Sequence, residues 1–138
     1  MREDEILVQV QEINSEFYHA FENLSIERME RIWKHEDNVV CIHPGWDLFT
    51  GWLAIRESWI TIFSNTERIK FIITNTKVRV FENIAVVVCL ENIETLVNGE
   101  ILRVGVIATN IFEQIQNQWL TIHHHGSSVS NYIRPNIS

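Results

Sequence analysis

The sequence predicts an α+β domain in which three helices come first and an antiparallel sheet follows. Residues 3–23 carry apolar side chains three or four positions apart, which indicates one face of an amphipathic helix. After residue 65 the chain holds four runs rich in Val, Ile, Thr and Phe, at approximately 67–81, 84–97, 100–113 and 118–125. Asn98-Gly99 separates two of these runs and is a strong signal for a two-residue hairpin turn. Helices followed by hairpin-linked strands are typical of the α+β class.

The remaining N-terminal elements are predicted from caps and spacing. Ser25 is a suitable N-cap for a short second helix. The stretch "NVVCIHPGW" reads as a short strand that ends at Pro44-Gly45, and Thr50-Gly51 introduces a third helix through about residue 63. That third helix carries an apolar stripe made of Trp52, Ile55, Trp59 and Phe63.

Length and composition favour a single domain that spans residues 1–138, with 131–138 as a frayed tail. The formal net charge of -7 argues against nucleic acid or an anionic membrane as the main partner. Cys41 and Cys89 lie in apolar runs without a CxxC motif, as buried thiols of a reducing compartment do, although a disulfide between them stays open. The acidic N-terminus does not look like a signal peptide, and no apolar run approaches the roughly 18 residues of a membrane span, so we expect a cytoplasmic protein.

A change of alternation within the first long run predicts a curved sheet. Ile69, Phe71 and Ile73 are odd-numbered, whereas Val78 and Val80 are even-numbered, so we expect a β-bulge near residues 74–76. A sheet that bends around three helices forms a cone with a hollow, where a ligand would bind.

The outer face of the sheet predicts a homodimer. The stretch "IAVVVCL" is apolar on both faces, but helices can cover only one of them. A second copy packed sheet to sheet is the simplest cover, and a long loop across the sheet is the alternative. We place four residues of the last strand on this outer face: Trp119, Thr121, His123 and His125.

The histidine triplet in "QWLTIHHHGSS" is split between the two faces by strand alternation. If Leu120 and Ile122 face the helices, His124 does too, whereas His123 and His125 point outward. An HxH pair on one face could bind zinc, with His43 or a partner chain as the source of further ligands, but the sequence places no Cys or carboxylate beside it, so we predict no metal and no cofactor. His124 is either a pocket residue or a core histidine with a hydrogen-bonding neighbour.

Other pocket candidates interrupt apolar rows or border them. Asn110 lies in the row that also carries Phe112, and either faces the pocket or meets water near the sheet edge. His43 closes the first strand and is suited to acid–base chemistry, unless it is a solvated loop residue. Tyr18 borders the stripe of the first helix, as a packing residue or an inward donor. Three tryptophans would form the pocket wall or pack in the core: Trp33, Trp46 and Trp59.

Four stretches together resemble the SnoaL-like branch of the nuclear transport factor 2-like superfamily. They are "ERMERIW", "CIHPGW", "TGWLAIRESW" and the closing "QWLTIHHHGSS", and the resemblance covers nearly the whole chain. It implies the cystatin-like cone, and a superfamily of isomerases, cyclases, dehydratases, binding proteins and oligomerisation modules.

The resemblance also implies roles for individual residues. Tyr18 matches the tyrosine that donates to the substrate oxygen in ketosteroid isomerase-like members, and His43 stands where their catalytic carboxylate precedes a proline. Ala108 replaces their protonated acid, so the isomerase triad is incomplete. Against the arginine-rich pocket of the calmodulin-dependent kinase association domain, the inner positions are Val88, Asn110 and Gly126. In polyketide cyclase-like chemistry, the base would be His43 or His124.

The sequence therefore predicts a homodimer that binds a small, largely apolar molecule in an aromatic cavity. One alternative is an acid–base enzyme, an isomerase, cyclase or dehydratase, with His43 or His124 as base and Tyr18 as donor. Its activity would rise with pH through roughly 6–7. A second alternative is a module that only oligomerises.

Overall fold

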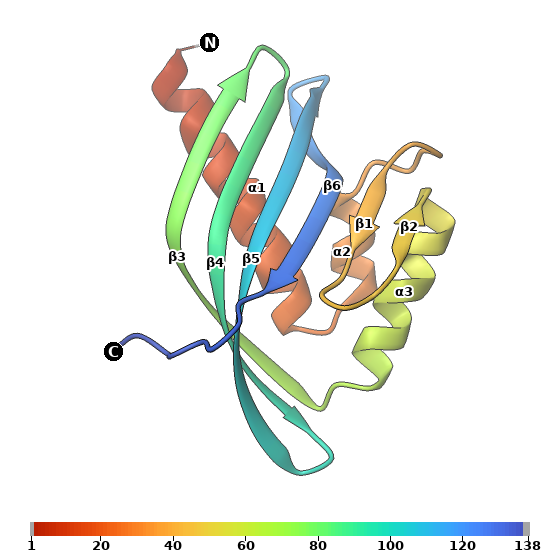
Figure 1. The fold of residues 1–138 in the computed structure, drawn as a ribbon. Helices are drawn as coiled ribbons and strands as arrows, with labels where there is room; N and C mark the ends of the chain where they lie inside the picture. Colours follow the sequence, from red (N-terminus) through yellow and green to blue (C-terminus); the bar gives the residue numbers. More distant parts are fainter. Residues whose placement is uncertain (1, 137–138) are drawn as a thin grey trace.

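The computed structural model describes residues 2–136 and confirms three helices followed by an antiparallel meander (Figure 1). The helices are α1 (Glu3–Glu22), α2 (Ile26–Ile32) and α3 (Trp52–Ser64). The strands are β1 (Val40–Ile42), β2 (Leu48–Thr50), β3 (Arg68–Phe81), β4 (Ile84–Val97), β5 (Glu100–Ile115) and β6 (Gln118–Ser128). The sequence pattern did not separate β2, which is only three residues long and pairs with β1.

The six strands form one curved sheet in the order β2-β1-β6-β5-β4-β3. All neighbouring strands are antiparallel except β1 and β6, which run in the same direction. In the chain these two strands are separated by β2, α3 and the strands β3 to β5. The helices lie on one face of the sheet and the C-terminal segment runs over the other (Figure 1). Within the described residues, no helix is both long enough and apolar enough to cross a membrane.

The predicted local signals are confirmed. The backbone N–H of Arg28 donates to Ser25 Oγ at 3.1 Å, so Ser25 caps α2. Asn98 and Gly99 both adopt positive φ angles, 52° and 78°, as a type I′ hairpin turn requires.

The β-bulge in β3 is confirmed. Thr74 pairs with Leu90 but Lys77 pairs with Val88, so Asn75 and Thr76 together oppose the single residue between those partners. The extra residue reverses the alternation of the strand, and a bulge of this kind bends a sheet.

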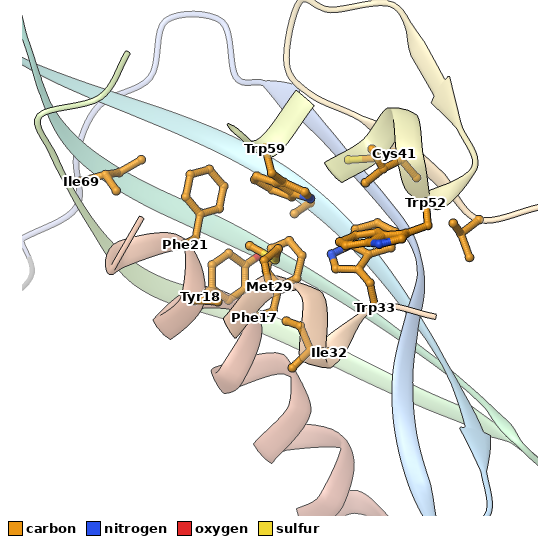
Figure 2. Close-up of a cluster of buried hydrophobic side chains, with 14 of the residues drawn as sticks. Phe17, Tyr18, Phe21, Met29, Ile32, Trp33, Cys41, Trp52, Trp59 and Ile69 are labelled. Carbon is orange, nitrogen blue, oxygen red and sulfur yellow. The ribbon is translucent and has the colours of Figure 1, made fainter. Parts of the chain in front are cut away.

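Aromatic side chains pack together in the core between the helices and the sheet (Figure 2). Phe17 and Phe21 of α1 meet Trp59 of α3 edge to face, with ring centroids 5.7 and 4.9 Å apart. Trp33 stacks on Trp52 at 6.0 Å. Contacts of this kind add roughly 0.5–1.5 kcal/mol per pair beyond burial of apolar area, so this region is a packed core.

The segment after β6 lies across the outer face of the sheet. The Tyr132 ring covers Gly105 so closely that an added Cβ would stand 2.2 Å from a ring carbon. Its hydroxyl donates to Asn92 Oδ1 at 2.5 Å, and Arg134 lies 3.6 Å from the Glu94 carboxylate. Residues 131–136, which we expected to fray, thus include anchored side chains; 137–138 lie outside the described residues.

Candidate functional site

Tyr18 lies at the centre of a buried polar network between α1 and the sheet. Its hydroxyl donates to Glu91 Oε2 at 2.5 Å and accepts from Asn110 Nδ2 at 3.1 Å. Cys89 Sγ lies 3.4 Å from the same oxygen. Burial, followed by the negative charge that Glu91 and Cys89 can carry, raises the pKa of Tyr18 well above its ordinary value, so the phenol keeps its proton.

Asn110 links this tyrosine to His124. Asn110 Nδ2 also donates to Asn14 Oδ1 at 2.9 Å, and its Oδ1 lies 2.6 Å from His124 Nδ1. Since both amide hydrogens of Asn110 are engaged, its oxygen must accept, and His124 therefore carries its proton on Nδ1. All six side chains of the network are at least nine-tenths buried, those of Asn14, Tyr18, Cys89, Glu91, Asn110 and His124.

Glu91 was missed by sequence reasoning. It is 3% exposed and faces the helices from β4, in the same row as Cys89. Burial raises the pKa of its carboxyl to about 7, and the hydrogen bond from Tyr18 opposes that shift only in part. Strand alternation carried the signal: Ala85, Val87 and Cys89 share its parity, so this carboxylate continues an apolar row.

A cavity of about 320 Å³ opens beside this network, between α1 and β3. Asn14 and Tyr18 line it from the helix, and Thr76 lines it from the bulge. Its lining is polar on the helix side and largely apolar on the strand side: Gln11, Asn14, Ser15, Tyr18, His19 and Glu22 against Phe71, Ile73, Thr76, Val78 and Val87. The volume is at the lower end of small-molecule sites, which run from about 300 to 1,000 Å³.

Comparison with known proteins decides the family. The SnoaL-like domain family matches residues 10–131 of this chain. The protein belongs to the SnoaL-like domain family. It is similar to a candidate dehydratase of the nuclear transport factor 2-like family from Streptomyces avermitilis, with 31% identity, a TM-score of 0.88, and coverage of 94% of this chain and 99% of that one.

More distant structures share the fold of this SnoaL-like domain, and at their low sequence identity the likeness extends to the fold only. A nuclear transport factor 2-like superfamily protein from Salmonella enterica is 15% identical, with a TM-score of 0.86 and coverage of 99% and 100% of the two chains. A candidate aromatic ring hydroxylase from Novosphingobium aromaticivorans is 16% identical, with a TM-score of 0.82 and coverage of 94% and 92%.

One curated relative is the F-box protein SKIP8 of Arabidopsis thaliana, 28% identical over 115 residues. The SnoaL-like domain described here spans about half of that protein's length, 47%. A SnoaL-like fold of this kind suggests small-molecule binding or an enzymatic role.

His43 is buried in the SnoaL-like domain and is not the solvated or rim residue we expected. Its Nε2 lies 2.9 Å from Ser58 Oγ, whose own hydrogen goes to the Ile55 carbonyl at 2.6 Å. The imidazole thus donates to Ser58 and ties the end of β1 to α3. Burial lowers the pKa of His43 to about 4, so the expected rise of activity between pH 6 and 7 does not follow from this residue.

His124 behaves in the same way. Burial, followed by the charges of neighbouring histidines, lowers its pKa well below the ordinary value. Its ring packs 4.7 Å from Phe17. Both predicted bases are therefore neutral core residues, and neither lines the cavity beside α1.

The tryptophans do not line that cavity either. Trp33 and Trp59 are buried in the aromatic core, and Trp46 is 41% exposed in the loop between β1 and β2. Rings from α1 and α3 pack in this core together with Trp33, which follows α2, so they fill the space there (Figure 2).

Phe112 faces the helices as predicted, but it packs in a second core cluster with Val10 rather than in the cavity. Val88 was wrongly placed. It lies on the outer face and contributes to a cavity beneath the C-terminal segment, because inner positions of β4 are the odd-numbered ones.

The outer-face assignment of Trp119 and Thr121 was also wrong. Trp119 is 4% exposed, packs against Val10 and donates from Nε1 to Gln9 of α1 at 3.1 Å. Thr121 is fully buried. The reason is a second bulge: Ile111 pairs with His123 but Phe112 pairs with Thr121, so the alternation of β6 reverses between Thr121 and His123.

His123 is half-buried and His125 is exposed. Among the described residues, no group of three His, Cys, Asp or Glu side chains is arranged to hold a metal ion. Cys41 and Cys89 are both free and buried.

Proposed function

We propose that this SnoaL-like domain binds a small, largely apolar molecule in the cavity between α1 and β3. The observation that carries the proposal is the meeting of that cavity with the buried network: Tyr18 and Asn14 belong to both. Apolar strand residues would hold the body of the ligand, and these two side chains would orient its polar group.

A blocked cavity tests this proposal. Ser15 is exposed, lines the cavity and lies on the helix surface, so Ser15→Trp fills the mouth without disturbing the core. Glu12→Trp is the matched control, since Glu12 is exposed on the same helix but outside the cavity lining. A metabolite screen by thermal shift should find a molecule that stabilises the wild type and Glu12→Trp but not Ser15→Trp. A hit that stabilises all three proteins equally would bind elsewhere, and the proposal would fail.

We also propose that the domain works as a homodimer through the outer face of the sheet. Ile107 is 50% exposed there, and Val86, Val88 and Leu90 are only half-buried. Because Tyr132 already covers part of this face, the C-terminal segment would be included in the interface.

Oligomeric mass tests the dimer. Ile107→Glu should convert it to a monomer in native mass spectrometry, since a charge would be buried at the interface. Leu53→Glu, at a site 80% exposed on α3, should leave the mass unchanged. A monomeric wild type would refute the dimer. A dimer in which no ligand is ever found would favour a purely oligomerising role.

A second candidate function is acid–base catalysis of the dehydratase type. It is supported by the Streptomyces protein, which shares 31% identity over nearly the whole chain and is described as a candidate dehydratase. The histidines do not favour this function, since burial keeps both neutral. The Tyr18–Glu91 pair does, because it couples a phenol to a carboxyl that titrates near neutral pH.

A further inference from the structure

We propose that Glu91, which is buried against Tyr18 behind the cavity lining, controls that tyrosine by its own proton: the neutral form of Glu91 turns the Tyr18 hydroxyl toward a ketone, ester or ether oxygen of a neutral ligand in the cavity. This inference rests on the proposed binding site between α1 and β3.

The first step is the fixed hydrogen bonding around the Tyr18 oxygen. Asn110 Nδ2 donates to it at 3.1 Å, and the orientation of Asn110 is set by Asn14 on one side and His124 on the other. One lone pair of the phenol is therefore always occupied. The phenolic hydrogen and the second lone pair remain to be assigned.

The charge of Glu91 decides where the phenolic hydrogen of Tyr18 points and which group occupies the second lone pair of its oxygen. An ionised Glu91 only accepts, so the phenolic hydrogen must point at Oε2, 2.5 Å away. A neutral Glu91 can donate its own hydrogen to the second lone pair of Tyr18. The phenolic hydrogen is then free for another acceptor, which is either Cys89 Sγ at 3.4 Å or a ligand in the cavity that Tyr18 lines. A ligand oxygen is the stronger acceptor of the two.

Among the described residues, Glu91 has a hydrogen-bond donor in Tyr18 but no positively charged partner. Tyr18 faces it from α1 and Cys89 from β4, while its partners on the neighbouring strands are Ile73 and Val106. This arrangement agrees with the carboxyl pKa of about 7, so both forms are present near neutral pH.

The lining of the cavity selects the class of ligand. None of its described lining residues is Lys or Arg, so an anionic ligand would have no counter-charge. The ionisable residues on its helix side besides Tyr18 are His19 and Glu22, and the Glu22 carboxylate already accepts from the Phe71 N–H at 2.8 Å. A neutral molecule with an oxygen acceptor and an apolar body fits these groups.

The experiment uses 1-indanone as the probe and indane as its hydrocarbon match. NMR titrations at about pH 5.5 and about pH 8.5 would measure the affinity of each probe for the wild type, Glu91→Gln, Tyr18→Phe and Glu100→Gln. Glu100 is exposed on the next strand and provides the matched charge control. The wild type and Glu100→Gln should bind 1-indanone about tenfold more weakly at the higher pH, the equivalent of one lost hydrogen bond. Indane should bind equally at both.

Glu91→Gln should bind 1-indanone without pH dependence, and Tyr18→Phe should no longer prefer it over indane. A wild-type affinity that does not change with pH, or a pH dependence that survives in Glu91→Gln, would overturn the inference while leaving the binding site in place. Failure of both probes to bind any protein at either pH would instead count against the proposed binding function itself.

Infrared spectroscopy of the ligand-free protein tests Glu91 independently of any probe. The wild type should show a protonated-carboxyl band at about pH 5.5 that disappears by about pH 8.5, and Glu91→Gln should lack it. Absence of that band from the wild type at the lower pH would refute the role of Glu91, whatever the probes do.

Discussion

Two buried clusters of titratable side chains are joined through Asn110 but differ in their surroundings. In the aromatic core, His43 and His124 lie against Trp59, with ring centroids 4.7 and 5.9 Å from it. Beside the cavity, Glu91 meets Tyr18. Burial opposes charge in both clusters, so it lowers the histidine pKa values and raises that of the carboxyl.

The shared cause has different consequences for function. Burial moves the pKa values of the two histidines away from neutral pH and leaves them as neutral packing groups, whereas it moves the pKa of Glu91 into the neutral range. Open volume lies beside the carboxyl cluster, since Tyr18 lines the cavity and neither histidine does. Residue type alone favoured histidine as the base, and the direction of the burial effect reverses that preference.

Removal of the Trp59 ring, which packs against the two histidines, should have the largest effect on stability. Trp59 is fully buried among Phe17, Phe21 and His43, so Trp59→Ala should lower the free energy of unfolding by about 3–5 kcal/mol. Trp46→Ala, at an exposed loop position, should cost less than about 1 kcal/mol. Chemical denaturation measures both, and equal losses would contradict the packed-core interpretation of Trp59.

Glu91→Gln should stabilise the protein at high pH. Because folding raises the pKa of this carboxyl from 4.5 to about 7, its contribution to stability is present below pH 4.5 and is lost as the pH rises to about 7. The variant should therefore be about 1–3 kcal/mol more stable than the wild type near pH 8 and nearly equal near pH 4.5. Urea unfolding at the two pH values checks this, and a difference independent of pH would contradict it.

His43→Asn should show the opposite dependence. Folding lowers the pKa of His43 from 6.5 to about 4, so its contribution is present above pH 6.5 and is lost as the pH falls to about 4. Between those values, the wild type should lose about 1–2 kcal/mol more stability than the variant. His125→Asn, at an exposed position, should follow the wild type. Urea unfolding over this pH range measures the stability of the three proteins. If the stability of His43→Asn fell with pH as steeply as that of the wild type, His43 would be a solvated residue.

Gly105→Ala should affect only the side of the sheet that supports the cavity. Its Cβ would collide with the Tyr132 ring and displace the hydroxyl from Asn92, whose amide holds Ile72 and Thr74 at the bulge. We expect a loss of about 1 kcal/mol. Hydrogen exchange should quicken at Val129, whose N–H donates to Gly105 O, and around the bulge but not around Trp59. Unchanged exchange at Val129 would show that the C-terminal segment does not depend on this contact.

Periodicity, caps and turn residues determined the elements of this protein. The stripes of α1 and α3, the Ser25 cap, the Asn98-Gly99 turn and the bulge in β3 depend on neighbours in the chain, so they can be predicted from it. Asn110 was also found as a polar interruption of an apolar row and Tyr18 as a residue that borders the stripe of the first helix, and the structure joins them directly.

Only the tertiary structure decided which face and which environment each side chain received. One bulge in β6 moved Trp119 and Thr121 to the inside, and no local residue pattern announced it. Helix packing filled the interior around Trp59 with rings and left space beside the bulge in β3. The protonation of Glu91, His43 and His124 follows from that distribution, because desolvation depends on all the atoms around a group and not on its neighbours in sequence.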